Sequence, residues 1–207
     1  KVRLEATAPY IYFENALKHI PKLPSKPKVI FVLREPSARL YSQYRFERFR
    51  TKRIQMTWEE YSKNDKLILH GDYEYYLKKW VKSLGKDRIY VCTFESLVSD
   101  PKECIRDMTT FLGINPFFYE NYNFIQHNET VAIKNKFIHR LGLTLQRYVP
   151  HGIQEKILPL YLKINSGKMP LKDPSDKKIL KSVKSDYQDS ILRLKKLFPN
   201  LNLESWV

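Results

Sequence analysis

The feature that most constrains this chain is an apolar run at residues 28–33 that leads directly into Arg34, Glu35 and Pro36. The run is rich in β-branched residues and follows a stretch broken by prolines, so it predicts a buried strand. Pro36 suits the first turn of a helix, which we expect to reach about Arg50. A buried strand that passes straight into a helix is typical of α/β folds.

The order of the remaining elements predicts a parallel sheet. A second apolar run at 88–94 reads as another buried strand, and the succession of strand, helix and strand indicates a parallel sheet flanked by helices. We expect one domain, 1–207, with an extended or looping segment at 5–13 and a mainly helical C-terminal part. The other expected helices cover residues 15–19, 58–63, 73–84, 101–112, 134–147, 153–164 and 174–197.

Arg34 and Ser42 together predict a site for an anion. The first strand delivers Arg34 to the carboxyl edge of the sheet, where open α/β folds bind ligands. The first amides of the next helix point at the same edge and attract negative charge. Ser42 lies further along that helix, where its hydroxyl can meet a phosphate that the guanidinium of Arg34 holds in bidentate fashion. The residues alone leave open a surface arginine and a helical serine without a ligand.

The net charge of +15 favours anionic partners such as nucleotides, acidic polysaccharides, nucleic acid or a membrane surface. Charge alone does not choose among them, and much of it also fits a solvated surface. The helix after Ser42 is strongly basic and suits either a cleft for an acidic acceptor or a solvated face. Its basic residues are Arg45, Arg48, Arg50, Lys52 and Arg53.

Neither the cysteines nor the hydropathy pattern adds a site. Cys92 and Cys104 fall in an expected strand and an expected helix, so each is predicted to be a small buried residue. No cysteine–histidine cluster has metal-ligand spacing, and we expect no metal. The apolar runs are too short for a transmembrane segment. The low cysteine content favours a reducing compartment.

The stretch 34–44 reads Arg-x-Pro-x-x-Arg-x-x-Ser-x-Tyr, with Arg39 and Tyr44 at the later positions. It resembles the pattern of sulfotransferases that use 3′-phosphoadenosine 5′-phosphosulfate (PAPS), both the carbohydrate or heparan-sulfate type and the bacterial type. The resemblance implies a fold like that of phosphate-loop nucleotide hydrolases. It also implies that Arg34 and Ser42 hold the 3′-phosphate of PAPS and of its product PAP.

Further stretches extend the resemblance over nearly the whole chain. Residues 71–81 are similar to the family's Gly-x-Tyr helix, which places Tyr73 among the expected nucleotide-site residues. Residues 91–113 resemble a strand, a Glu-x-Leu turn that includes Glu95 and a helix ending in Phe-Leu-Gly. The tail, 194–206, resembles the closing segment with a terminal Trp.

Two other groups are assigned by the same resemblance. Lys134, Asn135 and Lys136 match loosely a basic loop, within 127–136, that closes over the nucleotide near its adenine and 5′-phosphate; an ordinary solvated charge cluster is the alternative. Glu5 lies in a stretch similar to the Glu-x-x-Pro-x-Tyr segment near the acceptor pocket. That stretch has one extra residue and Ala6 where many members have lysine. Glu5 is a candidate base, with a purely structural role as the alternative.

The family's strand, Gly/Lys loop and helix that cradle the 5′-phosphosulfate precede the segment with which this chain begins. We therefore expect the chain to lack that element and to show no turnover alone, and the catalytic base stays unassigned. Residues 166–168, Ser-Gly-Lys, fall between expected helices without a preceding strand, so they do not replace it.

The resemblance implies transfer of a sulfuryl group from PAPS to a hydroxyl or amine, of a carbohydrate or another small hydroxyl compound, acidic polysaccharides included. One alternative, a nucleotide kinase of related fold, needs a Gly-x-x-x-x-Gly-Lys-(Ser/Thr) loop that is not found. The other is a basic non-enzymatic polyanion or nucleic-acid binder. It rests on charge alone, and we expect no nucleic-acid partner.

We expect a cytoplasmic location, as for bacterial members, with the Golgi lumen as the alternative if an anchor precedes Lys1. No apolar surface stripe stands out from the core pattern, so the sequence favours neither a monomer nor an oligomer.

Overall fold

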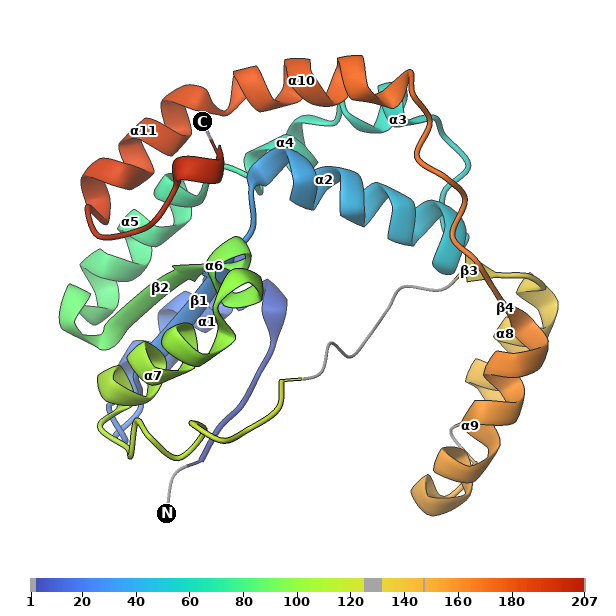
Figure 1. Ribbon diagram of the computed structural model, residues 1–207, viewed down its shortest axis with the longest axis horizontal. Coiled ribbons are helices and arrows are strands. Elements are labelled where there is room, and N and C mark those ends of the chain that lie inside the picture. The colour runs from blue at the N-terminus through green and yellow to red at the C-terminus, as the bar shows by residue number, and fades with distance from the viewer. Residues whose placement is uncertain (1–2, 125–131, 147, 207) are drawn as a thin grey trace.

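The structure is a computed structural model that describes residues 3–124, 132–146 and 148–206. At its centre two parallel strands, β1 (Val29–Leu33) and β2 (Ile89–Thr93), pair residue by residue over their whole length. Helices lie on both sides of this sheet (Figure 1). The expected α/β fold with a parallel sheet is therefore confirmed.

The two faces of the sheet are covered by helices α5 (Tyr73–Leu84) and α7 (Pro101–Leu112). Phe31 of β1 packs on Trp80 of α5, with ring centroids 5.4 Å apart. Tyr90 of β2 packs on Phe111 of α7 at 5.5 Å. Tyr90 is paired with the neighbour of Phe31, and successive side chains of a strand point to opposite faces, so the two aromatic contacts lie on opposite sides of the sheet.

Most of the remaining helices follow the expected order, while α4 and the two short strands β3 and β4 were not expected. The longer ones are α2 (Pro36–Arg45), which continues into the π-helical turn η3 (Phe46–Arg50), α8 (Lys136–Gln146), α9 (His151–Asn165), α10 (Asp176–Asp186) and α11 (Gln188–Leu197). The shorter ones are η1 (Ala8–Tyr12), α1 (Glu14–His19), η2 (Ile20–Lys22), α3 (Trp58–Tyr61), α4 (Asp65–Leu69), η4 (Lys86–Arg88), α6 (Phe94–Ser99), β3 (Ala132–Ile133), β4 (Ser166–Gly167) and η5 (Glu204–Trp206).

Three expectations about local structure were wrong. The second strand stops at Thr93, because its hydroxyl accepts a hydrogen bond from the Ser96 amide at 3.1 Å and caps the unexpected helix α6. The segment 5–13 is not extended or looping throughout, since Ala8–Tyr12 form the short helix η1 with Pro9 in its first turn. The single helix expected at 174–197 is broken at Tyr187 into α10 and α11.

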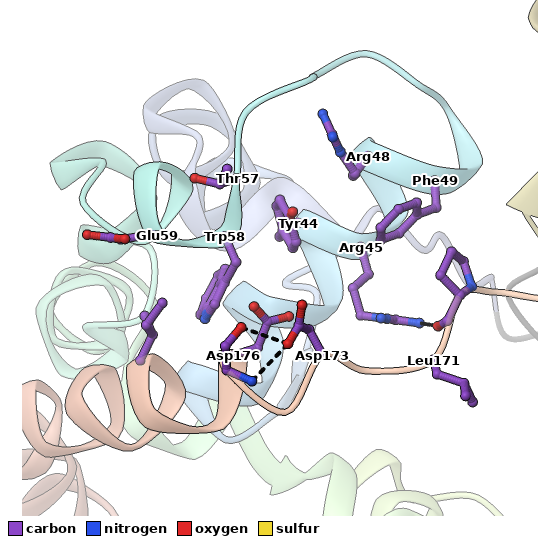
Figure 2. A pocket seen from close by; sticks show the side chains of 13 residues that line it. Tyr44, Arg45, Arg48, Phe49, Thr57, Trp58, Glu59, Leu171, Asp173 and Asp176 are labelled. Atoms are coloured by element: carbon purple, nitrogen blue, oxygen red, sulfur yellow. Dashed lines mark hydrogen bonds between the residues drawn. The ribbon is translucent and has the colours of Figure 1, made fainter.

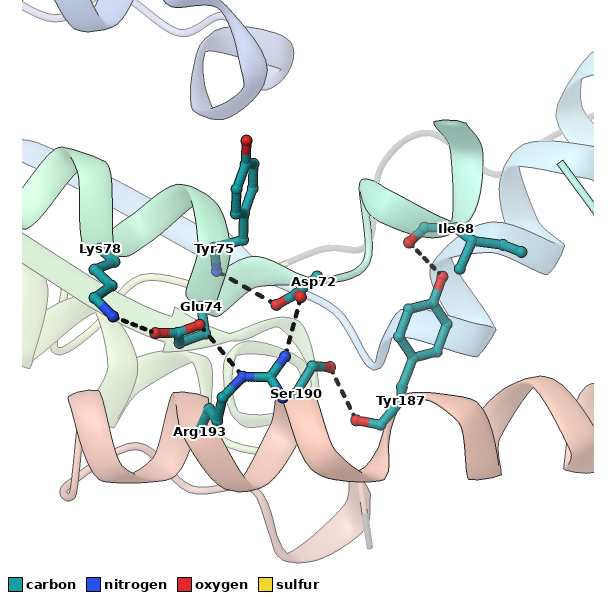
Figure 3. Close-up of polar contacts among 8 residues, drawn as sticks. All are labelled: Ile68, Asp72, Glu74, Tyr75, Lys78, Tyr187, Ser190 and Arg193. Atoms are coloured by element: carbon teal, nitrogen blue, oxygen red, sulfur yellow. Dashed lines mark hydrogen bonds and ion pairs between the residues drawn. The ribbon is translucent and has the colours of Figure 1, made fainter. Parts of the chain in front are cut away.

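The break at Tyr187 fastens the C-terminal helices to the body (Figure 3). The Tyr187 hydroxyl donates to the carbonyl of Ile68 at 2.8 Å. One turn and a half further on, Arg193 pairs with Asp72 at 3.1 Å and with Glu74 at 3.4 Å. Both carboxylates lie at the start of α5, so these contacts fix the N-terminal end of that helix.

None of the helices in the described ranges combines the length and the apolar character needed to cross a bilayer.

Candidate functional site

The turn between β1 and α2 is built around the buried carboxylate of Glu35. One of its oxygens accepts a hydrogen bond from the Ser37 amide at 3.0 Å. The other accepts from the Ala38 amide and from the Ser37 hydroxyl, both at 2.7 Å. Glu35 thus caps α2, with Pro36 as the first helical residue, and its negative charge is favourable at a helix N-terminus.

This cap corrects the expectation that the first amides of the helix face an anion. The amides of Ser37 and Ala38 already donate to Glu35, so a ligand phosphate at this edge relies on side chains rather than on these two N–H groups.

Four separate stretches of the chain converge on this turn. The hydroxyl of Tyr73 donates to the carbonyl oxygen of Arg34 at 2.8 Å. The amide of Glu35 donates to Glu95 at 3.1 Å, and the indole N–H of Trp206 donates to the second oxygen of Glu95 at 3.0 Å. The scattered residues 34–35, 73, 95 and 206 therefore form one hydrogen-bonded frame around the turn.

Only the backbone of Arg34 takes part in this hydrogen-bonded frame, and its guanidinium lies outside it. Arg34 is half-buried, and its guanidinium lies over the Phe94 ring at 5.2 Å from the centroid. Within the described residues the guanidinium forms no hydrogen bond or ion pair. A cation that is held by an aromatic ring but keeps its donors unused is suited to bind an anion.

Ser42 lies on the exposed side of α2, within the same helix that Glu35 caps. In the part of the chain that the structure describes, its hydroxyl has no hydrogen-bond partner. Within the described residues, Arg34 and Ser42 are thus the positions of the motif whose polar side-chain groups remain available, and a ligand shared by the two stays a prediction.

The other two polar positions of the motif face inward. Arg39 donates to the side chain of Gln43 at 3.0 Å and to the carbonyl of Leu67 at 3.1 Å. The ring of Tyr44 is buried and packs against Trp58, with ring centroids 5.5 Å apart. These two residues hold α2 in place and are not available to a ligand.

Tyr73 is 3% exposed, and burial raises the pKa of its phenol far above the usual value. The phenol therefore stays protonated and acts as a donor to the Arg34 carbonyl. The structure gives Tyr73 a part in positioning Arg34, while direct contact with a nucleotide stays a prediction.

Lys134, Asn135 and Lys136 lie at the other end of α2 from Arg34, where β3 packs near η3 (Figure 1). Lys52 donates to the carbonyl of Lys134 at 2.8 Å, and the Asn135 amide donates to the side chain of Asn165 at 2.8 Å. The structure does not bring this group together with Arg34. Residues 127–131 of the same expected loop lie outside the described residues.

Among the described residues, the Glu5 carboxylate contacts only residues close to it in sequence. Its carboxylate accepts hydrogen bonds from the Thr7 hydroxyl at 2.5 Å and from the Tyr10 hydroxyl at 3.2 Å. All three polar groups are in an exposed setting at the start of the chain. These contacts suit the structural alternative, and a role for Glu5 as a base stays a prediction.

A cleft of about 510 Å³ opens where α2 ends (Figure 2). Arg45 and Arg48 line one wall, and residues 170–179 line the opposite one. The guanidinium of Arg45 donates to the carbonyl of Pro170 and lies between two aromatic rings, those of Tyr41 and Phe49. Two of the basic residues expected either in a cleft or on a solvated face are thus cleft residues.

The floor of the region is fixed by a hydrogen bond from the Tyr41 hydroxyl to Asp176 at 2.6 Å. Burial, together with this carboxylate, raises the pKa of Tyr41 to about 12. Cys92 and Cys104 are both buried thiols, as expected. No group of three or more histidine, cysteine or carboxylate side chains within the described ranges is placed to hold a metal ion.

The family model of the sulfotransferase domain matches residues 13–136, more than half of the chain. The chain belongs to the sulfotransferase domain family. The matched range contains β1, the capped turn, α2, α5 and β2, and thus the frame around Arg34 except for Trp206.

Similar curated proteins agree with this assignment. The chain is 25% identical over 133 residues to the mouse bifunctional heparan sulfate N-deacetylase/N-sulfotransferase 4, and 23% identical over 133 residues to the mouse enzyme 3 of the same name. In both cases the match covers 58% of this chain but only 15% of the relative.

A solved sulfotransferase from Alicyclobacillus acidocaldarius shares the fold, with a TM-score of 0.59 and 17% identity. The superposition covers 96% of this chain and 64% of that one. The small parallel sheet with flanking helices is therefore a sulfotransferase fold of the α/β type.

Proposed function

We propose that this chain binds the donor nucleotide of a PAPS-dependent sulfotransferase. The observation that carries the proposal is the guanidinium of Arg34, which lies over Phe94 at the carboxyl end of β1 and has no polar partner in the described part of the chain. Membership of the family supports the reaction type, and the exposed hydroxyl of Ser42 on α2 supports the donor.

Arg34 and Ser42 would hold the 3′-phosphate of PAPS, which distinguishes it from nucleotides that lack this group. A guanidinium matches two phosphate oxygens at once, and a hydroxyl adds a third contact. The frame formed by Tyr73, Glu35 and Glu95 fixes the backbone of Arg34 beforehand, so little freedom is lost when the phosphate binds.

In the transfer itself, the bond between sulfur and the 5′-phosphate oxygen breaks while a bond forms between sulfur and the acceptor oxygen or nitrogen. The acceptor loses a proton to a base, and PAP leaves with the bridging oxygen. Such a reaction depends on in-line placement and on cations near the leaving oxygen. Arg34 positions the donor from its far end, and Glu5 is our candidate for the base.

For the acceptor we propose a hydroxyl or amine of a carbohydrate, acidic polysaccharides included. The cleft beside Arg45 and Arg48 combines these cations with the carboxylates of Glu59, Asp173 and Asp176 and with the aromatic side chains of Tyr44, Phe49 and Trp58. Such a lining offers donors and acceptors to sugar hydroxyls and aromatic rings to the apolar face of a sugar.

Thermal unfolding with and without PAP tests the proposal. A ligand present at about 100 times its dissociation constant stabilises a protein by about 2.7 kcal/mol, which is readily measured. Arg34→Ala should weaken PAP binding by roughly 10- to 150-fold, corresponding to about 1.5–3 kcal/mol for a charged hydrogen bond. Ser42→Ala should have a smaller effect, and Arg140→Ala, at an exposed arginine of α8, should have none.

Adenosine 5′-phosphosulfate, which lacks the 3′-phosphate, should stabilise the unsubstituted chain less than PAP does. Equal stabilisation of the chain and of Arg34→Ala by PAP would contradict the role of Arg34. Better protection by ATP than by PAP would favour a kinase instead.

A further inference from the structure

Helices α8 and α9 form a hairpin that projects from the body of the protein (Figure 1). Its base is rigid, because Asn165 is almost completely buried and binds the chain before α8 through both its backbone and its side chain. The Lys134 amide donates to the Asn165 carbonyl at 2.9 Å, and the Asn165 amide group donates to the Asn135 carbonyl at 3.1 Å.

The hairpin exposes many large aliphatic side chains. Seven of them are between 38% and 59% exposed, although they recur at the spacing of a buried helix face: Ile138, Leu141, Leu145, Ile153, Ile157, Leu160 and Ile164. Exposed apolar surface that is continuous, rather than scattered, marks a site of interaction with a partner or a membrane.

The contact between the two helices shows which way these residues point. His139 of α8 lies 2.7 Å from the Tyr161 hydroxyl of α9, and a Cβ at Gly142 would lie 3.8 Å from the Tyr161 ring. At about 100° per residue, the aliphatic residues of α8 lie roughly a quarter to a third of a turn away from this contact. On α9 the aliphatic residues lie roughly a tenth to a quarter of a turn from Tyr161, in the same rotational sense along the chain.

On each helix the aliphatic residues are rotated away from the α8–α9 contact in the same sense along the chain. Since the helices run antiparallel, these two rotations are opposite when both helices are viewed from one end. The apolar strip of α8 and that of α9 therefore lie on the same side of the hairpin and form one apolar face, while two further exposed leucines, Leu143 and Leu158, lie on the opposite side. Lys156 and Lys163 fall at the edge of this face, while Lys136 and Arg140 fall on the opposite side.

The charge of the segment identifies the occupant. Residues 132–172 contain eight lysines and arginines and a single carboxylate, that of Glu155. Two copies of such a segment repel each other, which disfavours a dimer through this face. An apolar face bordered by lysines is instead complementary to an anionic lipid surface, because the long lysine side chains reach the headgroups while the apolar residues enter the acyl boundary.

We propose that the α8–α9 hairpin docks the protein on an anionic lipid surface, lying in the plane of the interface with its apolar face buried. This role is independent of the proposed transferase activity. It brings the site near acceptors that are attached to, or held at, a membrane.

Co-sedimentation with vesicles tests the proposal. The chain should bind vesicles of equal parts phosphatidylglycerol and phosphatidylcholine, and bind vesicles of pure phosphatidylcholine at least tenfold more weakly. The double variant Leu145→Glu/Ile157→Glu, with one change on each helix, should lose at least tenfold in binding to the anionic vesicles. Leu192→Glu, at an equally exposed leucine of α11, is the matched control and should bind like the unsubstituted chain.

The double variant should keep the melting temperature and the PAP response of the unsubstituted chain, so that lost binding is not lost folding. Absence of vesicle binding, or equal losses in the double variant and in Leu192→Glu, would overturn the proposal. So would a dimer in sedimentation velocity without lipid that the double variant abolishes, since the face would then bind a second copy. Arg34→Ala should leave vesicle binding unchanged, which separates this test from that of the donor site.

Discussion

The phenol of Tyr73 donates a hydrogen bond of 2.8 Å to the backbone carbonyl of Arg34, the residue directly after β1, whose guanidinium has no hydrogen-bond or ion-pair partner among the described residues. The two residues are 39 positions apart in the chain. The bond joins the start of α5 to the edge of the sheet and connects the packing of the core to the geometry of the proposed phosphate site.

Tyr73→Phe should therefore affect both stability and ligand binding. The buried carbonyl of Arg34 would lose its donor, which costs about 1–3 kcal/mol in the free energy of unfolding. The turn would also loosen, and PAP should bind several-fold more weakly. Denaturant unfolding and calorimetric titration with PAP measure the two effects, with the exposed Tyr148→Phe as control. A loss of stability with unchanged PAP affinity would restrict Tyr73 to a structural role.

Glu35→Gln tests the cap of α2. The amide keeps the size of the side chain but removes its charge and one acceptor oxygen, so the bonds to Ser37 and Ala38 cannot all persist. Loss of an N-cap destabilises a protein by about 0.5–2 kcal/mol. Glu59→Gln removes an exposed carboxylate that pairs with Lys63 at 2.8 Å, and a surface pair of this kind contributes less than about 1 kcal/mol. Equal losses of stability in the two variants would contradict the capping role.

The elements with strong local signals could be predicted from the sequence. α7 begins at Pro101 and ends before Gly113, whose left-handed backbone closes the helix, and these residues mark both ends without any tertiary information. The same is true of β1 and of Pro36. Arg34 and Ser42 could be proposed as a candidate site because the motif places both on one strand-to-helix unit.

Features that depend on distant partners could not be predicted. The sequence does not reveal that the Glu35 carboxylate accepts hydrogen bonds from the first amides of α2. A carboxylate before a proline can either cap the helix or point into solvent. The sequence does not reveal that the apolar face of α8 and α9 is exposed either. The spacing of four residues between Leu141 and Leu145 occurs both in a helix packed against the core and in one without a partner. Only the arrangement in space shows that nothing within the described residues covers these side chains.

Gly71→Ala tests the break between α10 and α11. A Cβ at position 71 would lie 2.5 Å from the ring of Tyr187, closer than any real contact, so α11 or the loop before α5 must move. Overpacking of this kind typically destabilises a core by about 1–3 kcal/mol. Gly152→Ala, where a Cβ would meet no atom within 4 Å, should leave stability nearly unchanged.

The contact itself can be tested by a double-mutant cycle. In a Tyr187→Leu background the added methyl meets a smaller side chain, so the loss of stability caused by Gly71→Ala should shrink. An undiminished loss in that background would show that strain in the backbone, rather than the Tyr187 ring, is responsible.

His70 should make stability depend on pH. Its ring stacks on Tyr12 with centroids 4.2 Å apart, and burial, followed by the charge of Arg39, lowers its pKa below the usual 6.5. Below that value the unfolded chain binds a proton that the folded chain does not. The free energy of unfolding should therefore fall as the pH is lowered from about 6.5 to the lowered pKa, and level off below it.

Urea unfolding measured at intervals from pH 8 to about pH 5 checks this dependence. His70→Gln should flatten that part of the profile, although carboxylates and His139, whose pKa is also lowered by burial, leave some slope. His19→Gln, at an exposed histidine, serves as the control substitution. Parallel profiles for the unsubstituted chain and His70→Gln would show that His70 titrates alike in the folded and unfolded states, and would remove it as a source of acid sensitivity.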